Sequence, residues 1–149
     1  MNQNRISTAY DSEKIGSLFK LVRDSARFPA HYNWTNEQID QETLLSNFYL
    51  NVEATGSIRA FIAYRILEDS VEIMSLGTHP DFLRQRIMLR LLKGFVQNFS
   101  SQEQQVSLEV HEKNLAAISL YNRCGFKLLR QRQDYYRDGG AALVMTTSS

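Results

Sequence analysis

Hydrophobic residues recur along this chain with two different periods, and the change of period between segments predicts an alternation of helices and strands. Apolar residues three and four positions apart are typical of a helix with one buried face, whereas alternation or a short apolar run is typical of a strand. Turn residues separate several of these segments, as at positions 54–57 and 68–70. The predicted helices begin near residues 11, 35, 88 and 115, and the predicted strands are residues 5–10, 48–52, 58–67, 71–78, 106–110, 126–132 and 142–147.

Capping residues mark where the first two helices begin. Asp11 or Ser12 precedes the stripe of residues 15, 18, 19 and 22, and Thr35 with Gln38 has the form of a capping box. An aromatic-rich loop at 28–34 lies between these two helices. The longest helical stripe follows later, at residues 88, 91, 92, 95 and 99.

The order of the predicted elements is β-α-α-β-β-β-α-β-α-β-β. A strand, a long helix and a second strand in succession form a crossover, so strands 71–78 and 106–110 are expected to run parallel. The earlier strands are expected to form antiparallel hairpins. Because no repeat, linker or low-complexity segment interrupts the chain, we expect one domain over residues 1–149. Its fold class is mixed α/β, with a central, mostly antiparallel sheet, one parallel strand pair and flanking helices.

Composition and charge narrow the range of partners. The formal net charge is +1, so no global field favours nucleic acid or an acidic membrane. The single Cys124 excludes an internal disulfide and fits a reducing compartment. No spacing of His, Asp or Glu indicates a metal site. The N-terminus lacks the apolar core of a signal peptide and no apolar run approaches transmembrane length, so we expect a cytoplasmic protein.

The densest candidate chemistry lies in residues 107–126. Glu109 sits among apolar neighbours in a predicted strand, where a carboxylate is costly unless it is paired or used. Asn114 is placed to cap the following helix, and Tyr121, seven residues later, shares its helix face. A carboxylate, an amide and a phenol in one strand–helix unit can move protons. The simpler alternatives are a half-exposed glutamate, a plain helix cap and a core tyrosine.

The spacing of these residues matches a known family. The elements Leu108-Glu-Val110, Asn114, Ala117-Ile118, Leu120-Tyr121 and Gly125-Phe126 occur together, with weaker likeness over residues 134–136 and 142–145. On these motifs the chain resembles the GNAT superfamily of acyl-coenzyme A-dependent N-acetyltransferases, most of all those that acetylate the N-terminal alanine of ribosomal proteins.

The resemblance implies a role for each matched residue. Glu109 would be the general base that deprotonates the acceptor ammonium through water, and Tyr121 the general acid that protonates the leaving thiolate. Acetyl-CoA would be the cosubstrate, with a protein N-terminus or a small-molecule amine as acceptor, and the protein a monomer or homodimer. The implied pantetheine contacts are Leu76, Gly77, Thr78 and Asn114, and the implied acceptor contacts are Trp34, Tyr135 and Tyr136. A core anchor for Trp34 and cross-strand packing for the two tyrosines are the alternatives.

One family motif is altered. The family's pyrophosphate loop reads Gln/Arg-x-x-Gly-x-Gly/Ala, but this chain has no glycine between Gly77 and Gly94. One register puts Leu83, Arg86 and Met88 at the three defined positions, and a shift by one puts Arg84, Ile87 and Leu89 there. Glycines in such loops let backbone N–H groups approach phosphate, whereas arginines can pair with phosphate directly. The residues implied in this contact are Arg84, Gln85, Arg86, Ile87, Met88 and Leu89.

Three functions therefore remain open from the sequence. The first is an N-acetyltransferase that uses acetyl-CoA on a primary amine such as a protein N-terminus. The second is a protein of this fold whose altered loop no longer binds the cofactor and which serves as a non-catalytic binding module. The third is an acetyltransferase for small-molecule amines.

Overall fold

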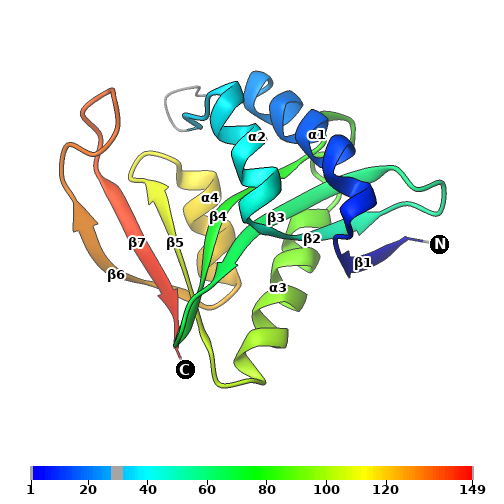
Figure 1. Cartoon of the computed structure of the whole chain (residues 1–149). Coiled ribbons are helices and arrows are strands. Elements are labelled where there is room, and N and C mark those ends of the chain that lie inside the picture. The colour runs from blue at the N-terminus through cyan, green and yellow to red at the C-terminus, as the bar shows by residue number, and fades with distance from the viewer. Residues whose placement is uncertain (1, 28–31, 149) are drawn as a thin grey trace.

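The computed structural model describes residues 2–27 and 32–148, and in this part of the chain seven strands form one sheet in the order β1-β2-β3-β4-β5-β7-β6. Figure 1 shows α1 and α2 together over one part of the sheet and α3 on the other side of the β2–β4 ribbons. The first part of the aromatic-rich loop, with Phe28 and His31, lies outside the described residues. The strands are β1 (Gln3–Ile6), β2 (Asn47–Val52), β3 (Ile58–Ile66), β4 (Ser70–Thr78), β5 (Gln105–His111), β6 (Phe126–Arg132) and β7 (Ala142–Thr147), and the helices are α1 (Ser12–Asp24), α2 (Asn36–Leu45), α3 (Ile87–Ser100) and α4 (Leu115–Arg123).

The fold class expected from the sequence is confirmed. The sheet is mixed: β4 and β5 are parallel and the other neighbouring strands are antiparallel. Two apolar cores lie on its two faces. One contains Leu91 and Phe95 of α3 and the other contains Phe19 of α1 and Ile39 of α2. The predicted capping box also forms, because Thr35 accepts from the Gln38 N–H and Gln38 accepts from the Thr35 N–H.

The first strand is the element whose predicted bounds differ most from the structure, since those of the other strands agree to within one residue. It was predicted at residues 5–10, but it ends at Ile6, and Ala9–Asp11 form a turn of 3₁₀ helix. The buried Asp11 carboxylate causes this turn, because it accepts hydrogen bonds from the Thr8 N–H at 2.8 Å and from both terminal nitrogens of Arg5 at 2.8 and 3.0 Å. Asp11 therefore connects the start of α1 to β1, and the turn that it stabilises ends the strand at Ile6.

Substituting Asp11 tests this connection and has a defined pH dependence. The hydrogen bonds from Arg5, supported by the Thr8 N–H, lower the pKa of Asp11 to about 2, below the ordinary value of about 3.9. A lowered pKa in the folded state stabilises the fold above about pH 4, and this contribution is lost as the pH falls to about 2. We expect Asp11→Asn to lower the free energy of unfolding at pH 7 by about 1 to 3 kcal/mol. Urea unfolding at pH 7 and pH 2 measures it; equal stability of the two proteins at pH 7 would contradict the assignment.

Gly77 explains how closely α1 approaches β4. A Cβ atom at this position would lie 2.5 Å from Cγ1 of Val22 on α1 and 3.2 Å from the Phe61 ring. Such contacts are too short, so a larger residue would push the helix away from the sheet. The position is therefore occupied by glycine for packing on the face that α1 covers.

The parallel pairing between β4 and β5 is short, and the two strands are not paired beyond it. Residues 70–72 of β4 pair with residues 105–107 of β5, and the recorded pairing ends there. Just beyond, β4 has a bulge, because Ala63 of β3 faces Ser75 while Tyr64 faces Ile73, which leaves Met74 as the extra residue. A bulge bends its strand and increases the twist. The two strands consequently diverge towards their carboxyl ends (Figure 1).

Two further findings concern membrane spans and metal sites within the described residues. No helix there is long and apolar enough to cross a membrane. No group of three or more His, Cys, Asp or Glu side chains there is arranged to hold a metal ion.

Candidate active site

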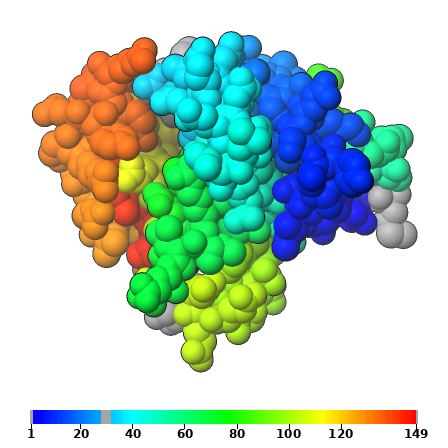
Figure 2. Space-filling view, in the orientation of Figure 1, coloured from blue at the N-terminus to red at the C-terminus, as the bar shows by residue number. Residues whose placement is uncertain are grey.

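A cavity of about 650 Å³ lies where β4 and β5 diverge. Its wall takes residues from both faces of the sheet, including Tyr121 on α4 and Trp34 just ahead of α2. In Figure 2 the surface is hollowed between the C-terminal strands in orange and red and the cyan and green region of α2 and β4, with part of β5 in yellow visible inside. The cavity therefore offers access from both faces of the sheet.

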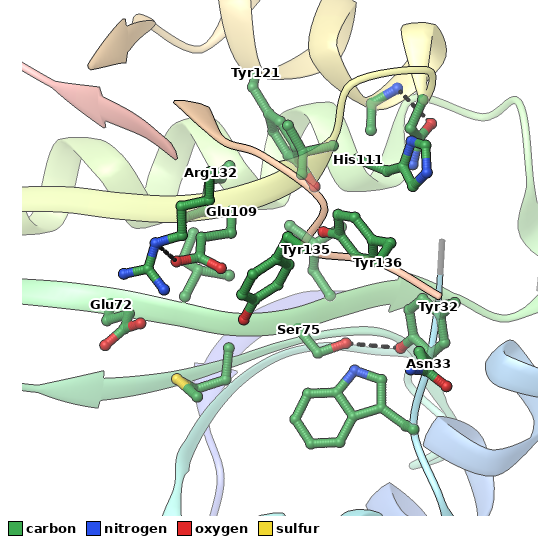
Figure 3. A pocket seen from close by; sticks show the side chains of 18 residues that line it. Tyr32, Asn33, Glu72, Ser75, Glu109, His111, Tyr121, Arg132, Tyr135 and Tyr136 are labelled. Atoms are coloured by element: carbon green, nitrogen blue, oxygen red, sulfur yellow. Dashed lines mark hydrogen bonds and ion pairs between the residues drawn. The ribbon is translucent and has the colours of Figure 1, made fainter. Parts of the chain in front are cut away.

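Glu109 lies on the cavity wall, in the middle of β5. Its side chain is 25% exposed, and its Oε1 lies 3.4 Å from Nε of Arg132 on β6. Figure 3 shows both groups at the same side of the cavity. Arg132 engages one carboxylate oxygen, and the carboxylate also interacts with the Tyr135 hydroxyl. From this position on the wall, Glu109 can receive a proton from a molecule in the cavity.

Tyr121 is a core residue that also lines the cavity. Its ring is buried and packs against Phe126, with the ring centroids 5.8 Å apart, so it belongs to the core on that face. The residue also lines the cavity, and Figure 3 shows its hydroxyl pointing from α4 into it. Burial, followed by the neighbouring Tyr136 and Cys124, raises the pKa of Tyr121 above its usual value. The phenol is therefore a neutral proton donor at physiological pH.

Asn114 is a helix cap that also faces the cavity. Its Oδ1 accepts a hydrogen bond of 3.2 Å from the Ala117 N–H at the start of α4, and both residues line the cavity. The cap uses the oxygen, so the Nδ2 amide group is the part of the side chain that can donate to a ligand. The two interpretations of Asn114 are thus compatible.

The edge of β4 supplies backbone groups to the same wall. Beyond Glu72, β4 keeps its pairing with β3, while residues Ile73 to Leu76 line the cavity on the other side. Of the predicted strand contacts, Leu76 lies on this wall. Gly77 and Thr78 lie further along β4, outside the cavity lining, and Gly77 faces α1.

The altered loop lies before α3 and has an unusual backbone. Arg84 and Arg86 both have left-handed conformations, with φ of 63° and 59°, and Arg86 is the residue that precedes the first turn of α3. Both side chains and that of Gln85 are exposed. Ile87 is buried in the core, and Met88 and Leu89 pack partly against it. Residues 84–89 are not part of the cavity lining, so the groups they offer to a ligand are backbone N–H groups and two guanidinium groups.

The left-handed conformation of Arg86 predicts the result of a glycine substitution. A side chain in this region costs roughly 1 to 2 kcal/mol, which a glycine avoids. We expect Arg86→Gly to leave the free energy of unfolding unchanged or to raise it by up to about 1 kcal/mol. Arg90→Gly, in the interior of α3, should lower it by about 1 kcal/mol. Urea unfolding of the two variants measures the difference, and equal destabilisation by both would contradict the left-handed geometry.

Two aromatic residues form the wall on the α1 side. The Trp34 ring lies edge-on to Phe19 with centroids 5.1 Å apart, and it also lines the cavity. Trp34 is therefore both a core anchor and a wall residue. Tyr32 lines the cavity beside it, and its hydroxyl accepts a hydrogen bond of 2.8 Å from Ser75 of β4.

Tyr135 and Tyr136 reach the cavity from the connection between β6 and β7. They lie outside the strand ladders, which excludes the cross-strand packing considered above. Their rings meet edge to face at 5.2 Å, and both line the cavity. Burial and the nearby Glu109 carboxylate raise the pKa of Tyr136 to about 12. The same two causes raise the pKa of Tyr135.

His111 holds this connection in place. The imidazole, whose side chain is fully buried, places Nε2 2.9 Å from both oxygens of Asp138, while Nδ1 accepts from the Lys113 N–H at 3.0 Å. The His111 ring also lies 4.6 Å from that of Tyr136. His111 is buried, which contradicts an exposed strand residue, and it also lines the cavity. It fastens the loop that carries the two tyrosines to the end of β5.

Two charged wall residues were not predicted. Glu72 occupies an apolar strand, as Glu109 does, and that shared signal could have found it. Arg132 lies in a largely exposed strand, and no local pattern marks it. The cavity thus brings together Leu76, Glu109, Asn114, Tyr121, Trp34, Tyr135 and Tyr136 from the predicted set, together with the unpredicted Glu72 and Arg132.

The comparisons of this sequence with a family model and with known proteins agree with each other. The sequence model of the acetyltransferase (GNAT) family matches residues 15–126. The ribosomal protein bS18-alanine N-acetyltransferase of Escherichia coli strain K12 is 31% identical over 91 residues, which are 59% of this chain and 62% of that protein. Its counterpart in Haemophilus ducreyi is 31% identical over 100 residues, 63% of this chain and 69% of that protein.

Solved structures of the same kind share the fold. The crystal structure of the Escherichia coli S18-alanine N-acetyltransferase matches all of this chain and 96% of its own, with a TM-score of 0.82 at 22% identity. Ard1 from Thermoplasma volcanium matches 97% of this chain and 95% of its own, with a TM-score of 0.77 at 23% identity. A chain of the NatC complex bound to Gag peptide and CoA covers 99% of this chain and 98% of its own, with a TM-score of 0.74 at 17% identity.

Proposed function

The chain belongs to the acetyltransferase (GNAT) family, and on this premise we propose that it moves an acetyl group from acetyl-CoA to a primary amine. The observation that carries the proposal is the opening between β4 and β5, in which Glu109 and Tyr121 line one cavity. A proton acceptor and a proton donor on one cavity fit a reaction that removes a proton from one reactant and returns one to another.

The proposed acid–base chemistry uses Glu109 as the proton acceptor and Tyr121 as the proton donor. Acetyl-CoA supplies the thioester whose carbonyl carbon the amine nitrogen attacks. Glu109 accepts the proton of the acceptor ammonium, through water, so that the nitrogen lone pair can form the C–N bond. The C–S bond breaks, and the sulfur takes a proton from the Tyr121 hydroxyl, whose raised pKa keeps it protonated. As the amide forms, the nitrogen loses its second proton, which restores the Tyr121 phenol through water, and the proton held by Glu109 is released to solvent. The net reaction gives an amide, a thiol and one proton.

The groups that would hold acetyl-CoA fit its pantetheine arm better than its phosphates. The edge of β4 up to Leu76 and the Asn114 amide offer backbone and side-chain hydrogen bonds along the cavity wall. The phosphates would lie near the start of α3, where the loop contains Arg84 and Arg86 and has no glycine. We propose that their guanidinium groups, together with the free N–H groups of the first helical turn, take the place of the missing loop glycines.

We propose a protein N-terminal amine as the acceptor. Support comes from the relatives, which are named for the alanine of a ribosomal protein on which they act. In this chain Trp34, Tyr135 and Tyr136, which line the same cavity as Glu109, would form the walls around the acceptor.

Peptide acetylation tests the proposal. The protein is incubated with acetyl-CoA and short peptides with a free N-terminal alanine, while thiol release and the mass of each peptide are followed. We expect thiol release that depends on the peptide and a product heavier by one acetyl group at its N-terminus. Thiol release at the same rate with and without peptide, and peptides of unchanged mass, would contradict it.

The loop before α3 favours one other function. With both arginines in left-handed conformation and no glycine, the protein could have kept the fold and lost the cofactor, serving as a non-catalytic binding module. This alternative predicts no binding of acetyl-CoA, which makes it directly distinguishable from the first.

A further inference from the structure

Glu72 is a carboxylate on the cavity wall for which the proposed reaction has no use. It lies in the short parallel stretch of β4, opposite Ser107 of β5, and it lines the cavity. Glu109 is two residues further along β5. Strand geometry puts the Cα atoms of the two glutamates about 8 Å apart. Figure 3 shows both side chains, with Tyr135 and Arg132, around the same space.

The two carboxylates differ in their partners. Glu109 is engaged by Arg132, whose guanidinium also lies over the Tyr135 ring at 5.7 Å. No hydrogen bond or ion pair within residues 2–27 and 32–148 reaches the carboxylate of Glu72. Its negative charge acts on the Tyr135 hydroxyl, since Glu72 is among the causes that raise the pKa of that residue. Within the described residues, Glu72 is therefore a carboxylate without a hydrogen bond or ion pair, on the same cavity wall as the proposed base.

The cationic side chain directly opposite Glu72 on the neighbouring strand already has a partner. Arg65 of β3 is the direct antiparallel neighbour of Glu72. Its guanidinium instead pairs with Glu42 of α2, a nearly buried carboxylate that also accepts a hydrogen bond from Ser46. Because Glu42 holds Arg65, this cross-strand neighbour is not paired with Glu72.

We propose that Glu72 binds a second positive charge of the acceptor. The inference rests on the proposed acetyl transfer and specifies its substrate class: an amine that carries another cationic group about one residue away from the reacting nitrogen. Either a peptide with a basic second residue or a short diamine has this chemistry. The aromatic faces of Trp34 and Tyr135, on the same cavity wall, would add to the attraction for a cation.

Matched acceptors test the proposal, because only the second charge differs. Two peptides begin Ala-Lys and Ala-Gln and are otherwise identical, and 1,4-diaminobutane is compared with butylamine. Trp34, the single tryptophan and a wall residue, reports binding by its fluorescence without acetyl-CoA. We expect wild type to bind the dicationic member of at least one pair about fivefold more tightly, with the same preference in kcat/KM. The pair that shows the larger preference identifies the source of the amine.

Glu72→Gln should abolish this preference by weakening binding of the dicationic acceptor alone. Glu53→Gln, in the β2–β3 turn and outside the cavity lining, should keep it. Acetylation of the acceptors with no preference in wild type, or with the preference intact in Glu72→Gln, would overturn the Glu72 proposal and leave acetyl transfer standing. A binding preference lost in Glu72→Gln, but no acetylation of any acceptor, would overturn acetyl transfer and support the cation site.

Discussion

Glu109→Gln is expected to lower kcat by about 10²-fold or more, the range typical of a lost general base. The amide keeps the size of the side chain and an oxygen that can accept from Arg132, so the cavity should keep its shape. What it loses is the ability to take the ammonium proton. Steady-state kinetics with acetyl-CoA and a peptide acceptor measure the effect, with the affinity for acetyl-CoA as the check that the site is intact.

The pH dependence separates a lost base from a damaged site. The α-amino group of an acceptor has a pKa near 8, so its unprotonated fraction rises with pH and needs less help from the protein. The difference in kcat between wild type and Glu109→Gln should therefore become smaller as the pH rises above about 8. Glu112→Gln, just beyond β5 and outside the cavity lining, is the matched control and should behave as wild type. A deficit that stays constant with pH, or equal effects of the two variants, would argue against Glu109 as the base.

Tyr121→Phe is expected to lower kcat by about 10²-fold or more, because the leaving sulfur would lose its proton donor. The phenyl ring fills the same core position against Phe126. Burial raises the pKa of Tyr121, so the phenol stays protonated across the ordinary assay range. Wild type should consequently show no loss of rate from Tyr121 deprotonation below about pH 10.

Two further tyrosines make this assignment testable. Tyr64→Phe removes a hydroxyl from a buried tyrosine that does not line the cavity, and it should leave kcat near the wild-type value. Tyr136→Phe asks whether Tyr136, whose phenol is close to Glu109, is the donor instead. If Tyr136→Phe abolished turnover while Tyr121→Phe retained it, the roles of the two tyrosines would have to be exchanged.

The sequence predicted most of the fold because its elements are defined by local patterns. The stripes of α1 and α3 and the capping box of α2 each show in a short window. The crossover rule then gave the parallel pair from the order of the elements alone. The first strand was predicted too long because a buried carboxylate, Asp11, turns the chain through bonds to Arg5 and Thr8. No hydrophobic pattern contains that information.

The site was less predictable because its shape depends on pairing between distant strands. Glu109, Asn114 and Tyr121 are close in the chain, and their spacing alone indicated a shared unit. The bulge at Met74 and the early end of the β4–β5 ladder arise from contacts between three strands, and they decide which side chains meet. Arg132 reaches Glu109 from β6, which is separated from β5 by β7. Sequence spacing cannot show such a contact.

The whole account depends on acetyl-CoA entering the cavity although the loop before α3 lacks the glycines of the family and carries Arg84 and Arg86. Calorimetric titration of acetyl-CoA into the wild-type protein tests this most directly. We expect saturable binding of one molecule per chain with a micromolar dissociation constant that weakens as salt is added, since Arg84 and Arg86 are proposed to pair with the phosphates. Absence of saturable binding at millimolar acetyl-CoA would contradict the account and favour the non-catalytic module.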